Sequence, residues 1–551
     1  MSLQADMCIN LKKLKVVLKK TAQLLFYRCV KEYSVQPSFK LSEGTKSIPT
    51  FVDMVNARRK QASKSVLVQV QSTNSFTKLY ELLLTFGEIS YINNFIRTPS
   101  NMSFSLVEFQ NINSLSTLFS KNNQLDFDII GTSCTSPFLS CNLKSEKKEK
   151  DNVALYDYGM FPNDQDIVNH LLKTENSSEQ ILKLYKLTTL NDLGVRLRFL
   201  TAYQTELAFS ALFPGSQCLP FGSSVNGCGR LNSDLDLVFN MNRKAIDIFN
   251  NASLSYQFKS NLRSDRLRLQ KHLDVLADVI QNLLPGCSNV VRILQAQVPI
   301  IKYKQNYTGL DCDLSLTNNN AITMTKLLYT LNHFDCRVKP FLLVIKHWAE
   351  KCNITNSFPG RWISNFSLSL LTLFYLQQIK VIPTIDEIFK FNKINCEHYD
   401  NEVLCTILHD KLIQFSTHKD TQISLFDMLF GFMEYYMKFD FSINGISLNS
   451  GQVIRKENIN GAMFIINPLD QELNVSKNVS FEEIENLKIK LTETFGILAT
   501  APNIKNDSEE WGIIPLIKTS TLQKKKFDLN TFHPKRKTRL LNVGDLFKDL
   551  M

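Results

Sequence analysis

The sequence has few of the features that mark secreted, zinc-binding or membrane-spanning proteins. Only 12 of its 551 residues are cysteine, and no two of them form a C-x-x-C pair. This spacing excludes a zinc ribbon and argues against a disulfide framework, so we expect a reducing compartment. No run of about 18 uncharged apolar residues occurs, and we therefore expect no insertion into a membrane. An apolar content of 44% excludes a wholly disordered chain.

Acidic residues are missing from the start of the sequence. No Asp or Glu lies between Asp6 and Glu32, although the first 34 residues include seven basic residues. A basic, amphipathic segment without acids is typical of a mitochondrial presequence, and a solvated basic arm is the alternative. We therefore expect residues 1–45 to be a presequence and arm that direct the protein to the mitochondrial matrix.

The other end of the chain is also basic. Residues 501–551 are expected to form a tail, which contains the basic clusters 524–526 and 535–537. Such clusters occur in nuclear localisation signals, in RNA-binding tails and in solvated tails, so a nuclear location is the alternative to the mitochondrial one. The net charge of +11 permits a polyanionic partner such as RNA.

A small N-terminal unit, residues 60–142, precedes a charged linker at residues 143–157. Its apolar pattern predicts, in order, strand 66–70, helix 76–86, strands 89–96 and 103–109, and helix 115–119. This β-α-β-β-α order resembles an RNA-recognition motif (RRM), a small sheet covered by two helices.

The residues with which such a domain would read RNA are mostly absent. It stacks bases on aromatic side chains of its central strands, but here Leu67 and Leu106 stand at two of these positions and only Phe104 is aromatic. We therefore expect an interaction domain that pairs with a second copy through an apolar surface, with RNA stacking as the alternative. This surface would consist of Val66, Val68, Phe104 and Leu106. A homodimer is the default assembly.

The rest of the chain divides by its pattern of apolar residues. Residues 158–210 look helical and are expected to pack on a central domain. Residues 211–320 mix strand and helix signals, and residues 321–500 are mostly helical. The sequence thus predicts an α+β multidomain protein, with a mixed-sheet unit ahead of a helical one.

The strongest chemical signal lies in residues 219–239. Gly222 and Ser223 follow an apolar step, and such a turn presents N–H groups and a hydroxyl to an anion. Asp234 and Asp236 alternate with leucines, so in a strand both carboxylates point to one face. Two adjacent carboxylates repel each other unless cations lie between them, as in a two-metal site.

A third carboxylate is expected from the strand-like residues 300–316. Asp311 and Asp313 both lie there and would share a face, so the spacing alone does not choose between them. A phosphate-binding turn beside a set of carboxylates is what a site for a nucleoside triphosphate requires.

The arrangement of these residues resembles the nucleotidyltransferase superfamily. Ten residues separate Ser223 from the Asp-Leu-Asp-Leu step, as in non-canonical poly(A) polymerases. Asp313 lies in a Cys-Asp-Leu step with an Asn-rich step soon after it, and this resemblance favours Asp313 over Asp311. Stretches similar to mitochondrial poly(A) polymerases are residues 358–368, 429–441 and 467–480. The family's fold implies a palm at residues 211–320 and a helical central (PAP-associated) domain at residues 321–500.

The resemblance also implies a role for each residue of the site. The catalytic residues, which would hold two Mg²⁺ (or Mn²⁺) ions, are Asp234, Asp236 and Asp313. The residues expected to contact the nucleotide are Phe221, Gly222, Ser223, Thr323, Thr325, Lys346, Ser364 and Asn365. Within this set Lys346 matches a lysine that grips the phosphates, and Ser364 matches a serine near them.

Some residues depart from the family pattern. Glu350 stands where several relatives have a second phosphate-binding base, so either Lys351 replaces that base or one phosphate contact is missing. Asn365 stands where a uridylyltransferase would stack an aromatic residue on the base, and a helix cap is its alternative role. His347 is expected to pack within a helix, since no His has the spacing of a metal ligand.

These features predict a template-independent RNA 3′-adenylyltransferase that uses ATP to add poly(A) to the 3′ ends of mitochondrial RNA. A terminal uridylyltransferase is the first alternative. Such enzymes read uracil with a His after the Asp/Asn-Pro step, where this chain has Leu473, and no His lies between His418 and His533. The second alternative is a catalytically inactive RNA-binding scaffold, which the presence of all three carboxylates disfavours.

Overall fold

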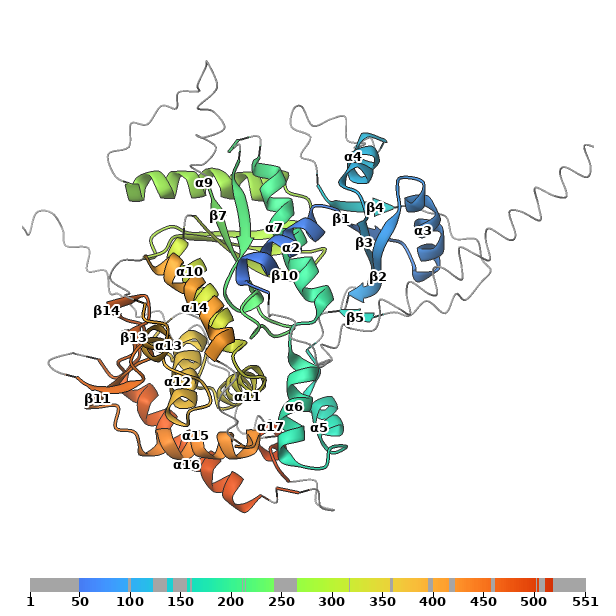
Figure 1. Ribbon diagram of the computed structural model, residues 1–551. Helices are drawn as coiled ribbons and strands as arrows, with labels where there is room; N and C mark the ends of the chain where they lie inside the picture. Colours follow the sequence, from blue (N-terminus) through green and yellow to red (C-terminus); the bar gives the residue numbers. More distant parts are fainter. Residues whose placement is uncertain are drawn as a thin grey trace, which may run out of the picture.

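The computed structural model shows three units that pack together (Figure 1). The residues that it describes are 49–97, 101–121, 136–141, 156–158, 161–210, 212–213, 215–241, 265–316, 318–356, 360–394, 400–415, 422–456, 461–501, 503–504 and 511–518. The expected presequence, most of the linker and residues 519–551 of the basic tail lie outside these ranges.

The N-terminal unit is a five-stranded sheet in the order β4-β1-β3-β2-β5. Its strands are β1 (Ser65–Val70), β2 (Ile89–Arg97), β3 (Met102–Phe109), β4 (Phe138–Cys141) and β5 (Tyr156–Tyr158). Helices α3 (Phe76–Leu84) and α4 (Ile112–Lys121) cover one face, where Val66 and Val68 pack against Phe76 and Leu79. The strands and helices follow the expected β-α-β-β-α order. The short edge strands β4 and β5, each parallel to its neighbour, were not predicted.

Helix α7 (Asp192–Phe209) covers the other face of this sheet. Leu67, Phe104 and Leu106 are almost fully buried there, in one cluster with three leucines of the helix. The expectation that Val66, Val68, Phe104 and Leu106 form one exposed surface was wrong. Leu67 pairs with Leu106 and Val66 with Val107, so the two valines point to the opposite face, and all four side chains are buried within the chain.

Ion pairs hold this helix against the N-terminal unit. Arg196 of α7 contacts the buried Glu108 of β3 at 2.7 Å and lies over the ring of Tyr91 at 3.9 Å. Lys64 also contacts Glu108, at 3.2 Å, and Arg58 of α2 (Phe51–Ala62) contacts Asp192 at 2.6 Å. Because these groups are mostly buried, the pairs fix how the unit is oriented on α7.

The central unit is a second five-stranded sheet in the order β6-β7-β10-β9-β8. Its strands are β6 (Gln217–Pro220), β7 (Leu235–Asn240), β8 (Cys287–Ile293), β9 (Ile300–Gln305) and β10 (Leu310–Leu316). The alternate residues Leu235 and Leu237 of β7 point into a core with α9 (Asp265–Leu283) and the end of α7. The opposite face of β7 therefore carries Asp236.

The third unit is mostly helical, and its core surrounds α11. Its elements are α5 (Asp164–Leu171), α6 (Ser177–Thr188), α10 (Asn319–Asn332), α11 (Val338–Lys351), α12 (Asn365–Gln378), α13 (Ile385–Phe391), α14 (Asn401–Phe415), α15 (Leu425–Lys438), α16 (Phe481–Thr500) and α17 (Ile514–Lys518). Two hairpins complete it: β11 (Asn444–Ser447) with β12 (Gln452–Arg455), and β13 (Ile466–Asn467) with β14 (Asp470–Asn474). Phe341, Ile345 and Trp348 of α11 are buried at its centre.

Two expected boundaries differ from the structure. Within residues 158–210, α5 and α6 pack on the helical unit, but α7 packs on the two sheets. Residues 511–518 were expected in the basic C-terminal tail, yet Trp511 is fully buried in the helical core. The Ile513 N–H donates to Gln180 Oε1 of α6 at 2.8 Å, so this segment closes the core.

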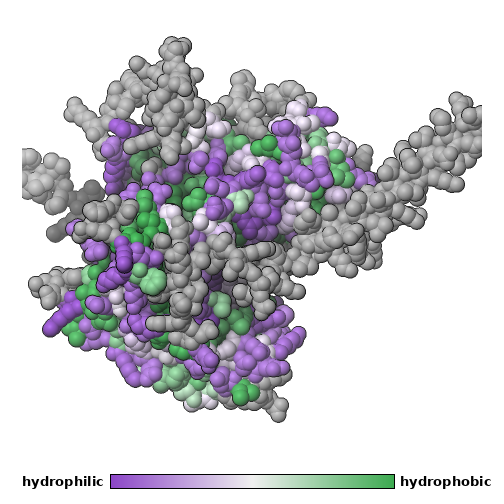
Figure 2. Space-filling model, in the orientation of Figure 1, coloured by the Kyte–Doolittle hydropathy of each residue, from purple (hydrophilic) through white to green (hydrophobic). Residues whose placement is uncertain are grey.

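None of the helices in the described ranges combines the length and the hydrophobicity needed to cross a bilayer. On the face seen in Figure 2, hydrophilic and hydrophobic residues are interspersed.

Candidate active site

Two carboxylates lie side by side on the neighbouring strands β7 and β10. These strands are parallel, and Asp236 pairs with Asp313 in their register. Paired residues on adjacent strands are only about 5 Å apart, so the two side chains share one small region of the sheet face. Asp234 lies just before β7, two residues from Asp236, and joins the same edge.

The strand pairing separates Asp313 from Asp311, which the spacing could not do. Pairing between β7 and β10 begins at Cys312, so Asp311 has no partner on β7. The side chain of Asp311 is 64% exposed and lies 3.7 Å from Lys304. The side chain of Asp313 is 22% exposed and accepts a hydrogen bond from Lys302, its neighbour on β9.

The turn after β6 approaches the carboxylates closely. Gly222 has a φ of +66°, and a Cβ at this position would lie 2.7 Å from Asp236 Oδ2. Only glycine fits there without strain. The Gly222 N–H donates to Thr325 Oγ1 at 2.9 Å, and the Phe221 N–H donates to the Asp236 carbonyl at 3.0 Å. The turn, formed by the 3₁₀ helix η2 (Gly222–Ser224), is thereby fixed beside Asp236.

The loop between η2 and β7 is held together at its two ends by Arg198 of α7, which the sequence analysis did not single out. Arg198 is fully buried, and its Nε donates to Ser224 Oγ at 3.2 Å. Its Nη2 donates to the Ser233 carbonyl at 2.5 Å, immediately before Asp234. In the sequence Arg198 stands between Leu197 and Phe199, but Arg196 stands two residues earlier, so the sequence alone does not show which arginine is buried.

Burial and mutual repulsion raise the pKa of two carboxyls. Loss of solvent contact, followed by the charges of Asp313 and Asp234, raises the pKa of Asp236 to about 7. Partial burial and then the charge of Asp313 also raise the pKa of Asp234. Lys302 opposes both shifts but does not cancel them, so the cluster has uncompensated negative charge.

The donor set of this cluster suits a hard divalent cation. Mg²⁺ and Mn²⁺ prefer carboxylate oxygens, and a bound cation would remove the repulsion just described. Within the described part of the chain, however, no three His, Cys, Asp or Glu side chains converge tightly enough to enclose a metal as they stand. To bind the cation, Asp313 would have to break its hydrogen bond with Lys302.

Two lysines of α11 face the same loop. Lys346 is 9% exposed, and among the described residues its ammonium has no carboxylate within ion-pair distance; burial lowers its pKa. Burial also lowers the pKa of Lys339, which lies about two helical turns earlier in α11. A Cβ at Gly227 would lie 3.1 Å from Lys339 Cε, so this lysine lies under the loop.

The other expected nucleotide contacts are placed as follows. The hydroxyl of Thr325 is used by Gly222, and the hydroxyl of Thr323 donates to the Asn319 carbonyl at 3.1 Å. Ser364 and Asn365 are exposed at the start of α12. Ser364 caps this helix by accepting from the Ser367 N–H at 3.0 Å, so Asn365 is not the cap. Within the described ranges, no hydrogen bond or ion pair joins these residues to the carboxylates.

Lys351 does not replace the base that Glu350 displaces. Its Nζ lies 2.5 Å from Asp164 of α5, which neutralises it. Glu350 contacts Arg230 of the loop, at 2.5 Å. The base beside Glu350 is thus Arg230, which the sequence analysis did not single out.

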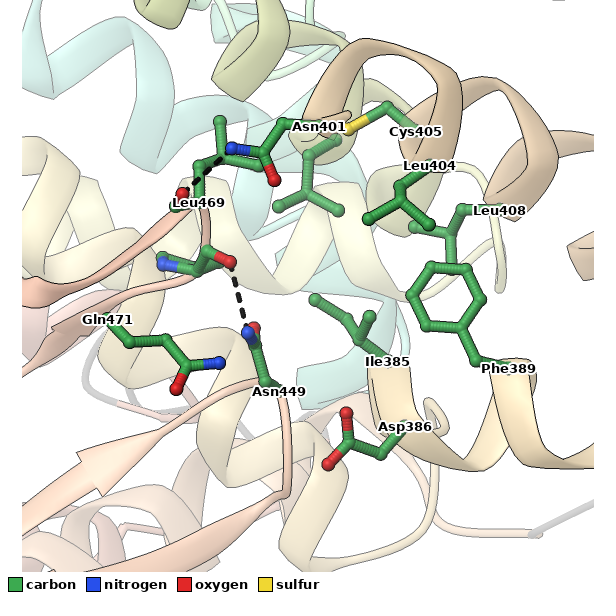
Figure 3. A pocket seen from close by; sticks show the side chains of 12 residues that line it. Ile385, Asp386, Phe389, Asn401, Leu404, Cys405, Leu408, Asn449, Leu469 and Gln471 are labelled. Atoms are coloured by element: carbon green, nitrogen blue, oxygen red, sulfur yellow. Dashed lines mark hydrogen bonds between the residues drawn. The ribbon is translucent and has the colours of Figure 1, made fainter. Parts of the chain in front are cut away.

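A separate pocket of about 320 Å³ lies behind the hairpin of β13 and β14 (Figure 3). We call this hairpin the Asn-Pro hairpin, because Asn467 and Pro468 lie at its turn. The pocket is bounded by α10, α13, α14 and the hairpin β13–β14. Asn449 Nδ2 donates to the Pro468 carbonyl at 3.0 Å, and Asn401 Nδ2 donates to the Leu469 carbonyl at 2.9 Å. None of its lining residues belongs to the carboxylate site.

Comparison with known proteins agrees with this geometry. Residues 178–333 match the family model for the central palm domain of mitochondrial-like poly(A) RNA polymerase. The mitochondrial poly(A) RNA polymerase of Drosophila melanogaster is 34% identical over 91% of this chain and 84% of its own length. The human enzyme is 30% identical over 89% of this chain and 85% of its own length.

Solved structures show the same likeness. The apo crystal structure of mtPAP superimposes with a TM-score of 0.77 at 29% identity, over 85% of this chain and 99% of that one. Its complex with ATPγS gives a TM-score of 0.75 at 28% identity, with the same coverage. Another crystal structure of mtPAP contains UTP.

The palm sheet with its carboxylates is therefore that of a nucleotidyltransferase. The chain belongs to the mitochondrial poly(A) RNA polymerase family, which confirms the resemblance found in the sequence. By this membership it is a polynucleotide adenylyltransferase.

The raised pKa of Asp236 predicts a pH-dependent stability of the metal-free protein. Between about pH 4 and pH 7 the folded state keeps a proton that the unfolded state has released, so stability falls as the pH rises through this window. Asn at position 236 removes this dependence. Asp236→Asn should therefore stabilise the protein in EDTA more at pH 8 than at pH 5, by roughly 2–3 kcal/mol.

Thermal unfolding at both pH values measures this difference. Asp311→Asn is the matched control, since its exposed carboxyl should change little at either pH. An equal gain for Asp236→Asn at pH 5 and pH 8 would contradict the prediction.

Proposed function

We propose that the chain is a template-independent RNA 3′-adenylyltransferase that extends the 3′ ends of mitochondrial RNA with ATP. The observation that carries this proposal is the pairing of Asp236 with Asp313 beside the turn at Gly222. A triphosphate held at the turn would have its reacting phosphate next to the carboxylates.

In the proposed reaction the RNA 3′-hydroxyl attacks the α-phosphorus of ATP. A new P–O bond forms, the bond between the α- and β-phosphates breaks, pyrophosphate leaves, and the hydroxyl proton passes to solvent. When bound at Asp234, Asp236 and Asp313, Mg²⁺ or Mn²⁺ supplies Lewis-acid stabilisation of the charge on the reacting groups.

The chain's own residues orient the nucleotide. Ser223 would offer its hydroxyl to the phosphates, and Lys346 supplies a cation that no carboxylate in the described part of the chain neutralises. Arg198 keeps the loop in place, so that binding costs little rearrangement. Phe221, Thr323, Ser364 and Asn365 are proposed to line the nucleoside and phosphates. Gly222 and Thr325 shape the turn through their hydrogen bond.

The two alternatives are less well supported. An inactive scaffold needs no set of acids with raised pKa, and burying uncompensated charge would only destabilise it. A uridylyltransferase would be expected to present a His near Leu473, and the residues between His418 and His533 include none. The complex of mtPAP with UTP indicates that binding alone need not select the base.

We propose the mitochondrial matrix as the place of action, on the basis of the basic N-terminal segment and of the names of the relatives. The nucleus remains the alternative to be tested by imaging a tagged full-length protein. Exclusively nuclear signal would contradict the proposal.

The two candidate third carboxylates give the sharpest test of the site. Asp313→Asn should reduce adenylate addition to an RNA primer by about 10³-fold or more, because it removes a ligand of the reacting metal. Asp311→Asn, two residues away on the same strand, should keep activity within a few-fold. Equal losses in the two variants, measured as primer extension with ATP, would refute the assignment.

ATP should be the preferred substrate. The Asn-Pro hairpin presents the half-buried Leu473 and no histidine to a base, so its side chains would not favour uracil over adenine. We expect at least about tenfold faster incorporation of AMP than of UMP, which equals about 1.4 kcal/mol. A competition between ATP and UTP at equal concentrations measures the ratio, and faster UMP incorporation would favour the uridylyltransferase.

We propose that two copies associate through the outer surface of the N-terminal unit. Its sheet face is covered, but Leu82 and Leu84 of α3 and Ile112 of α4 are 39–49% exposed. Light scattering should give the mass of a dimer, and Leu82→Asp with Ile112→Asp should give a monomer. Leu106→Ala is a control that should lower stability by about 2–5 kcal/mol through a cavity. A monomeric wild-type protein would contradict the proposal.

A further inference from the structure

The loop between η2 and β7 runs along α11 over a row of basic side chains. Gly227 lies against Lys339, and the buried Cys228 is near both Lys339 and Lys346, whose charges act on its pKa. Arg230 follows, and it contacts Glu350 at the end of the helix. The loop thus brings three cations together, and among the described residues a single carboxylate, Glu350, forms an ion pair with one of them.

Arg230 is held firmly but has spare hydrogen-bonding capacity. Its guanidinium lies 4.6 Å from the ring of Phe161, which in turn stacks on the buried His347. The side chain of Arg230 is only 12% exposed. In the described part of the chain its one side-chain hydrogen bond goes from Nη1 to Glu350 Oε2, and its buried Nε has no partner. A guanidinium can donate five hydrogen bonds.

Glu350 is the more exposed member of this pair. Its side chain is 48% exposed, and it is the single carboxylate among the described residues that pairs with any of the three cations. The neighbouring pair on the same helix is different, because Lys351 contacts both oxygens of Asp164. The Arg230 pair is therefore open to exchange with a stronger anion.

We propose that Arg230 is a ligand of the terminal phosphates of ATP. In the free protein Glu350 holds the Arg230 side chain in place, and the phosphates replace Glu350 when the nucleotide binds. The inference rests on the proposed site, because the loop that carries Arg230 begins at Ser223 and ends at Asp234. Lys346 and Arg230 then bind the triphosphate together, and a planar guanidinium matches phosphate oxygens better than an ammonium does. Glu350 competes with the nucleotide and so disfavours anions of low charge such as AMP.

Titration calorimetry of the full chain with ATP and with AMP, in Mg²⁺ and without RNA, tests this role. Arg230→Gln should weaken ATP binding by about 10- to 100-fold, the value of a hydrogen bond to a charged group, and leave AMP binding unchanged. Glu350→Gln should tighten ATP binding by about two- to fivefold, because the competing carboxylate is gone. Arg230→Lys should fall between wild type and Arg230→Gln.

Lys351→Gln is the matched control, since it breaks a comparable ion pair one residue along the helix and should leave ATP affinity unchanged. Thermal unfolding verifies that each variant is folded, and Arg230→Lys serves if Arg230→Gln is not. Equal weakening of ATP and AMP by Arg230→Gln, or none, would overturn the proposal. A wild-type protein that binds no ATP would instead refute the proposed nucleotide site itself.

Discussion

The parallel pairing of β7 with β10 is the constraint on which the rest of the site depends. It sets Asp236 beside Asp313 and leaves like charges next to each other in a partly buried place. Each neighbouring feature limits that cost: Lys302 pairs with Asp313, Gly222 leaves room for the Asp236 carboxylate, and burial shifts that carboxyl toward its protonated form. Binding of a cation at these carboxylates, which we propose, would therefore stabilise the folded protein.

Helix α7 joins this site to the N-terminal unit. Its first half covers the N-terminal sheet through Leu197 and Leu200, and its last turn enters the palm core through Phe209. Between them, Arg198 holds the loop that carries the carboxylates. The turn between β9 and β10 makes a second connection, because Tyr307 packs against Phe104 with their ring centroids 6.4 Å apart. The N-terminal unit therefore helps to support the strands that carry the carboxylates.

Much of the fold and of the carboxylate site could be predicted from the sequence where the local pattern of residues determines the structure. Alternation with the leucines predicted the face of the sheet on which Asp236 lies, and the helical pattern of the region that contains α11 was clear. Partners distant in sequence were not predictable. Helix α7 has apolar residues on most of its surface, so its periodicity cannot tell which sheet each face meets. The choice between Asp311 and Asp313 needs the register of β10 on β7, and the role of Arg230 needs its contact with a helix 120 residues later.

The covered sheet face limits what the N-terminal unit can do. Stacking of bases would need exposed aromatic rings, but Phe95 and Phe104 are buried and stack on each other at 5.6 Å. Exposing them would move α7 away and expose three leucines, at a cost of about 5–9 kcal/mol, which is comparable to the stability of a whole domain. The same movement would pull Arg198 from the loop that positions Asp234. RNA binding on this face would therefore disturb the site that we propose extends RNA, so we expect the RNA to bind to other surfaces of the enzyme.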